Sequence, residues 1–137
     1  MKAELFASFA GFDDFLVYLV VSLAYFAAYL AVYVRITPYP ELELIRRGNV
    51  AAACSLSGSL LGFAVPLASA VAHSVNLADM ALWALIAMAV QVGAYVAVKL
   101  LIPGIARDIA DAKTAPGIFL GALSLAVGIL NAACMSY

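Results

Sequence analysis

Four long apolar runs without a Lys, Arg, Asp or Glu residue fill most of the 137-residue chain, and the charged residues lie mainly between them. A helix rises about 1.5 Å per residue, so about 20 residues cross a hydrocarbon core of about 30 Å. Each run contains a stretch of this length. The sequence therefore predicts four membrane-spanning helices, over about 15–34, 50–72, 80–98 and 115–136.

The composition excludes an ordinary soluble domain. Hydrophobic residues make up 67% of the chain and charged residues 11%, whereas a soluble domain contains about 25% charged residues. The runs lack the strand-like alternation of a membrane β-barrel, and only helices and closed barrels span lipid. We therefore expect an all-α integral membrane protein with one membrane domain over residues 1–137.

The basic residues predict how the helices are oriented in the membrane. Six of the seven lie in the two segments 35–49 and 99–113, and they are Arg35, Arg46, Arg47, Lys99, Arg107 and Lys113. Because basic loops stay on the cytoplasmic side, both termini are expected in the periplasm, with the protein in a bacterial inner membrane. The net charge of -1 argues against nucleic acid as a partner. The lipid bilayer is the expected partner, and the basic loops are placed to meet anionic head groups.

The two halves of the chain resemble each other. A shift of 66 residues places Asp13 on Asp79 and Tyr29 on Tyr95, and a shift of 65 places Pro38 on Pro103 in the loops. This pattern predicts two tandem repeats, each a helix, a basic loop and a helix, over about 13–73 and 79–137. Each unit holds an even number of spans, so the two copies must be parallel in the membrane.

Small residues are expected to hold the helices together. Close backbone approach drives helix association in lipid, and two segments of spans two and four match the G-x-x-x-G pattern. The predicted packing residues are Gly58, Gly62, Gly117, Gly121 and Gly128. Contacts within one subunit and a contact between subunits both remain open.

Few polar groups are expected inside the membrane. Gln91 and Asn131 are the two amides deep in the spans, where they would form interhelical hydrogen bonds or contact a substrate. One face of span one carries a stripe of tyrosines, which would be a packing face or a path: Tyr18, Tyr25, Tyr29 and Tyr33. No Asp, Glu, Lys, Arg or His lies within the predicted spans, which argues against proton-coupled transport.

The inner loops have a distinctive build. Residues 41–49 alternate acidic, apolar and basic side chains and predict a short interfacial helix, with Asn49 as the N-cap of span two. Arg46 and Arg47 are its candidate contact residues, and residues 103–113 have the same build. A cytoplasmic protein partner at these loops and loops that lie on the head groups are both open.

No enzyme signature is present. We find no nucleophile paired with a base, no metal-ligand spacing and no cofactor motif, so neither an enzyme nor a cofactor is expected.

Three segments resemble the YjfL-like family of small bacterial inner-membrane proteins. They are Glu43 to Ala53, the Gly58-x-x-x-Gly62 that follows, and Gly128 to Met135. The resemblance covers nearly the whole chain and implies a four-helix inner-membrane protein of two tandem units. The family is a domain of unknown function, so the resemblance implies no reaction. Some relatives are found near membrane-stress proteins of the phage-shock type.

We therefore expect an inner-membrane protein that is a structural or regulatory, membrane-stress-associated component and self-associates as a homo-oligomer. The alternative is a small channel or transporter assembled from several copies. The absence of ionisable side chains from the spans favours the first interpretation.

Overall fold

The computed structural model describes residues 1–135, and helices joined by short turns form this part of the chain. In chain order the helices are α1 (Lys2–Phe9), α2 (Phe12–Ile36), α3 (Glu41–Arg46), α4 (Val50–His73), α5 (Leu77–Leu101), α6 (Ile105–Ala110) and α7 (Thr114–Cys134). The predicted all-α fold is confirmed. The predicted ends of the fourth span at 136 and of the second repeat at 137 lie outside the described residues.

Four helical segments are long and apolar enough to cross a membrane within the described chain. They are Lys2–Ile36, which joins α1 and α2, then α4, α5 and α7. The four predicted spans are thus confirmed as helices, and α2 and α5 extend beyond the predicted limits at both ends. The added residues include Asp13 and Lys99, whose charges suit the head-group region rather than the hydrocarbon core.

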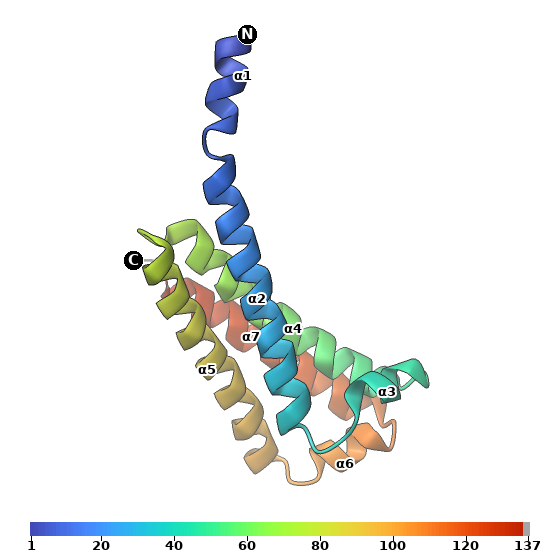
Figure 1. The fold of residues 1–137 in the computed structure, drawn as a ribbon. Coiled ribbons are helices and arrows are strands. Elements are labelled where there is room, and N and C mark those ends of the chain that lie inside the picture. Colours follow the sequence, from blue (N-terminus) through green and yellow to red (C-terminus); the bar gives the residue numbers. More distant parts are fainter. Residues whose placement is uncertain (136–137) are drawn as a thin grey trace.

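Helix α1 was not predicted from the sequence. It has no buried residue, and Figure 1 shows it continuing the line of α2 beyond the other helices. The ring of Phe12 lies 6.3 Å from that of Phe9 and 6.0 Å from that of Phe15. Spacing of three residues places these rings on one side of the helical path, where successive turns bring them together. Gly11 separates the two helices.

The centre of the bundle is the contact between α4 and α7, which is the most extensive in the described chain. Helix α5 packs against both, and α2 packs mainly against α4 and α5. The buried core is richest along α4, where Phe63 is fully buried. Helix α2 contributes Tyr29 and Tyr33, while much of its outer half is exposed to the surroundings of the bundle.

The short helices α3 and α6 lie at one end of the bundle, and the N-terminus and the end of α7 lie toward the other (Figure 1). Both short helices end in the same way. Gly48 follows α3 with φ 86°, and Ala112 follows α6 with φ 61°. In this left-handed conformation the next amide turns back, so that Asn49 N donates to Leu44 O and Lys113 N donates to Asp108 O. The short helices predicted in the two inner loops are therefore confirmed.

Candidate functional site: a buried glutamate among tyrosines

Glu41 is a buried carboxyl residue at the end of the bundle that carries α3 and α6. The chain leaves α2 at Thr37, whose hydroxyl donates to Tyr33 O at 3.2 Å, and then turns back toward the bundle. Pro40 caps the start of α3, a position where its missing N–H costs nothing. The new helix packs against α4. Glu41, its first residue, is left only 1% exposed.

Three tyrosines surround this carboxyl group. Tyr33 comes from α2, Tyr39 from the turn before α3 and Tyr95 from α5, and all three are buried. The rings of Tyr33 and Tyr95 meet edge to face with centroids 5.4 Å apart. The charge of Glu41 acts on the phenol group of each. We call these four residues the Glu41–tyrosine cluster.

The oxygen atoms of this cluster have few partners. Both carboxylate oxygens of Glu41 and the hydroxyl oxygens of Tyr33, Tyr39 and Tyr95 are buried without a hydrogen bond of good geometry. Buried polar groups in proteins are almost always hydrogen-bonded, and each exception calls for an explanation. Five such atoms in one place mark the cluster as the candidate site.

Burial dominates the electrostatics of the cluster. It raises the pKa of Glu41 to about 8, and the nearby Tyr39 hydroxyl offsets part of this rise. Burial also raises the pKa of Tyr39, and the Glu41 charge adds to that effect. Transfer of a carboxylate out of water disfavours its charged form unless a positive group compensates it. Around neutral pH, Glu41 therefore takes up a proton more readily than an exposed glutamate does.

Deeper in the membrane, the tyrosine stripe of α2 is a packing face. The Tyr29 hydroxyl shares a 2.5 Å hydrogen bond with Ser59 Oγ, and its ring stacks on Phe63 at 4.6 Å. The Tyr25 hydroxyl donates to Ala81 O on α5 at 2.9 Å. Two of the four hydroxyls therefore link α2 to its neighbouring helices, while the Tyr33 hydroxyl belongs to the cluster.

The two predicted amides lie in separate places. Gln91 is buried one helical turn from Tyr95, and its Nε2 donates to Ser124 O on α7 at 2.8 Å. Its Oε1 has no hydrogen-bond partner. Asn131 is half-buried, with a buried Nδ2 that also has none, about two turns beyond Ser124 along α7. Gln91 therefore joins helices close to the cluster, and Asn131 lies toward the other end of the bundle.

The predicted packing glycines all lie in the contact between α4 and α7. A Cβ atom added to Gly58 would overlap the backbone of Gly121, and one added to Gly128 would overlap the backbone of Gly62. Gly117 lies in the same way against the backbone of Ala51. The absence of side chains at these positions is what lets the two backbones approach so closely.

The three loop residues predicted to make contacts are divided between surface and interior. Arg46 and Arg47 are exposed, and Arg47 forms a 2.6 Å ion pair with Glu43. Asn49 is buried and caps α4 by accepting from Ala52 N at 3.0 Å, which confirms the predicted cap. Its Nδ2 also donates to Ile109 O of α6 at 2.9 Å.

The exposed side of α3 is hollowed. A depression of about 470 Å³ is lined by Leu42, Glu43, Arg46 and Arg47, which we call the arginine surface. Glu41 lies on the opposite side of the same short helix and faces the bundle. One turn and a half of helix therefore joins a buried carboxyl to an exposed cationic surface.

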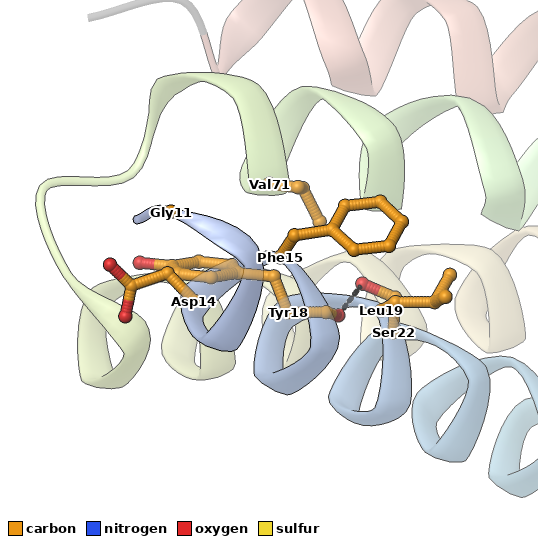
Figure 2. A pocket seen from close by; sticks show the side chains of 7 residues that line it. All are labelled: Gly11, Asp14, Phe15, Tyr18, Leu19, Ser22 and Val71. Carbon is orange, nitrogen blue, oxygen red and sulfur yellow. Dashed lines mark hydrogen bonds between the residues drawn. The ribbon is translucent and has the colours of Figure 1, made fainter. Parts of the chain in front are cut away.

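A second hollow lies near the N-terminal end of α2. Figure 2 shows its lining, with Tyr18 and Phe15 of α2 and Val71 of α4. The Ser22 hydroxyl is tied to Tyr18 O at 2.6 Å, which leaves the surface largely apolar. Asp14 is the one charged residue of the lining, and the remaining apolar surface suits lipid acyl chains.

Comparisons with known proteins agree with this architecture. The family described as Domain of Unknown Function (DUF350) matches residues 6–135. The chain belongs to this family. It is 38% identical over 123 residues to the UPF0719 inner membrane protein YjfL of Escherichia coli strain K12, and equally to that of Escherichia coli O157:H7. The match covers 90% of this chain and 93% of each relative. No solved structure matches the chain significantly.

The family resemblance seen in the sequence is thus confirmed. Because the function of the DUF350 family is unknown, membership does not assign a reaction to this chain. The described residues contain no group of three or more His, Cys, Asp and Glu side chains placed to hold a metal ion.

Glu41 is a candidate site residue that the sequence did not indicate. It stands in an alternating segment beside the exposed Glu43, and nothing local distinguishes the two. A signal exists in the other short helix, where the first residue, Ile105, is also buried. Glu41 is the first residue of α3 and Ile105 the first residue of α6, so one short helix begins with a buried acid and the other with a buried apolar residue.

Proposed function

We propose that the chain is a regulatory component of the bacterial inner membrane, the location named for its Escherichia coli relatives. We further infer two tandem units in parallel orientation, α2–α3–α4 and α5–α6–α7, with both termini periplasmic. The repeated order of long, short and long helices supports this inference, as does the concentration of basic residues at one end.

The two-sided build of α3 carries the proposal. Its inner side places Glu41 among the tyrosines, and its outer side presents Arg46 and Arg47. Helix α3 is only six residues long, so Glu41 and the arginines belong to one small rigid unit. A change in the charge or contacts of the Glu41 carboxyl group would therefore move the arginines. The arginine surface would then contact anionic lipid head groups or an acidic cytoplasmic protein.

The centre of the bundle argues for a regulatory role over a conduit. The backbones of α4 and α7 meet at Gly58, Gly62 and Gly121, which leaves no room there for a path through a single subunit. The exposed apolar side chains on α2 and α5 offer faces for self-association as well as for lipid. A homo-oligomer in parallel orientation is part of the proposal.

A lipid-enrichment measurement tests this function. We expect the protein, reconstituted in bilayers of phosphatidylcholine with a minority of labelled phosphatidylglycerol, to gather the anionic lipid around it. The Arg46→Gln/Arg47→Gln double variant should lose a large part of this enrichment, since each basic residue near the surface contributes about 1 kcal/mol. Lys2→Gln, which changes a basic residue of α1, is the control. Equal enrichment by the double variant and the wild type would refute the role of the arginine surface.

A small oligomeric channel or transporter is the second candidate, and the buried Glu41 favours it. Ionisable groups enclosed by membrane helices often mark ion pathways. In that case, liposomes containing the protein should show saturable ion flux. Replacement of Glu41, Tyr25, Gln91 or Asn131 by apolar residues of similar size would abolish it, while the arginine double variant would conduct normally. Liposomes that pass no ions would leave the regulatory role as the better account.

A further inference from the structure

We propose that the Glu41–tyrosine cluster is a binding site for one small monovalent cation. The Glu41 carboxylate would be its charged ligand, and the hydroxyls of Tyr33, Tyr39 and Tyr95 its neutral ligands. The site is separate from the arginine surface, and its test does not require that surface to bind a ligand.

The charge of the site points to a single positive charge. The groups that face Glu41 are Tyr29 and Tyr33 of α2, Tyr39 of the preceding turn and Tyr95 of α5, and none of them is basic. A buried carboxylate without a positive partner is strongly disfavoured. One monovalent cation balances its charge. A divalent ion would require further carboxylates, and no cluster of them exists among the described residues.

The available atoms are those that a hard cation prefers. Five oxygen atoms of the cluster, two from Glu41 and one from each of its three tyrosines, lack a hydrogen bond of good geometry, and the Tyr39 hydroxyl lies close to the Glu41 carboxyl group and to Ser55. Alkali cations exchange their hydration shell for a set of oxygen ligands of this kind. Gln91, one turn before Tyr95 on α5, also has a buried acceptor without a partner, its Oε1.

Packing alone does not explain an acid at this position. Ile105 starts the other short helix and is 2% exposed, compared with 1% for Glu41. An apolar side chain therefore suits the fold at such a place, and it avoids the cost of burying a carboxyl group. Unlike an isoleucine, the acid at position 41 supplies a negative charge and two oxygen atoms that can bind a cation.

An ion would reach the site from the inner surface. Pro38 and Pro40 are exposed, and they flank Tyr39 and precede Glu41 directly. Two members of the cluster, Tyr39 and Glu41, are therefore direct chain neighbours of solvent-exposed residues. The turn 37–40 is therefore the entry route that the proposal assigns to the ion.

Thermal unfolding of the purified protein in mild detergent tests the proposal. We would titrate sodium chloride against choline chloride at constant ionic strength and at about pH 9, above the pKa of about 8 of Glu41. Potassium and lithium chloride serve as parallel probes. The wild type should show a saturable rise in Tm with at least one of these cations, because a ligand that binds only the folded state stabilises it.

Two variants of the same helix separate a site from general salt effects. Glu41→Gln should lose the saturable rise. Glu43→Gln removes an exposed carboxylate two residues away and should keep it. Tyr95→Phe removes one proposed ligand and should weaken the apparent affinity about tenfold, whereas Tyr18→Phe, outside the cluster, should leave it unchanged.

Isothermal titration of the same salts into the folded protein provides a second measurement. If Glu41→Gln does not fold, Glu41→Ile takes its place, because an isoleucine is the buried first residue of the other short helix, α6. A salt response that is equal in the wild type and the Glu41 variants would overturn the proposal. So would a protein that responds to pH alone, since the cluster would then bind only a proton.

Lipid enrichment by the arginine surface is measured separately, so the failure of either proposal is distinguishable from failure of the other.

Discussion

Two glutamates of α3 stand two residues apart and meet opposite environments. Glu43 is exposed and pairs with Arg47, whereas Glu41 is buried under the tyrosines. Their difference arises from the turn at Thr37–Pro40, which folds α3 back against α4. A charge pattern read along the chain does not contain this long-range contact. The sequence thus predicted the short helix but not which of its acids would be buried.

The burial of Glu41 predicts a pH dependence of stability in sodium-free detergent. Its pKa is about 8 in the folded protein against 4.5 for an exposed glutamate, so folding binds the proton more tightly. The resulting stabilisation is complete below about pH 4.5 and is lost as the pH rises through about 8. We expect the free energy of unfolding to fall by roughly 2 to 5 kcal/mol over this range.

Chemical denaturation at several pH values measures this effect. Glu41→Gln should remove most of the dependence between these limits, and Glu43→Gln should preserve it. A wild-type protein that becomes more stable as the pH rises from 5 to 8 would contradict the assignment of the raised pKa to Glu41.

Asn49 makes two contacts whose loss should be measurable. Asn49→Ala removes the cap of α4 and the side-chain donor to Ile109 O, which keeps only its hydrogen bond from Ala112 N. We expect a loss of about 1 to 2 kcal/mol of stability in detergent. Lys113→Ala is a matched control, because Lys113 precedes α7 and makes no side-chain cap, and its exposed ion pair contributes less than about 1 kcal/mol. Equal losses of stability in the two variants would show that the two Asn49 hydrogen bonds contribute no more than an exposed ion pair.

At the scale of the helices, apolar length and loop composition were strong predictors. The spans and the two short helices follow from these properties. Helix α1 was not predicted because Lys2 and Glu4 interrupt its apolar pattern. Phe9 and Phe12, whose rings contact each other, both precede the predicted first span, which began at residue 15. The energetic role of the glycines in the contact between α4 and α7 stays a prediction.

Substitution of Gly121 tests that role. A Cβ atom at this position would overlap the Cys54 carbonyl of α4, so Gly121→Ala should force the helices apart. We expect a loss of about 1 to 3 kcal/mol in detergent unfolding. Gly93→Ala is the control, because Gly93 lies in α5 with nothing within 4 Å of an added Cβ. The control should be neutral or more stable by up to about 1 kcal/mol, since alanine favours helix.

The same pair of variants shows whether the contact works within one subunit. If Gly121→Ala leaves the unfolding midpoint unchanged but shifts the oligomer to smaller species, the glycines join subunits instead. A midpoint equal to that of Gly93→Ala, with no change of assembly, would rule out both roles.

At the scale of the whole molecule, hydropathy gives the number of spans but does not give their partners. Each span is apolar on most sides, so its sequence hardly distinguishes a lipid-facing side from a protein-facing one. The structure places α4 at the centre and leaves α2 at the edge, with its outer half exposed. Helix α2 joins the bundle chiefly through the tyrosines of its C-terminal half, next to the candidate site.

The charge distribution predicts the orientation of the whole bundle. Single cysteines would be placed in a background without Cys54 and Cys134, using Glu43→Cys in α3 and Val75→Cys in the exposed turn before α5. If the basic loops are cytoplasmic, a membrane-impermeant maleimide added to intact spheroplasts should label position 75 and not position 43. Lysed membranes, in which both positions react, are the control for accessibility. Labelling of position 43 alone would invert the topology, and equal labelling of both in intact spheroplasts would show dual insertion, which is incompatible with a parallel assembly.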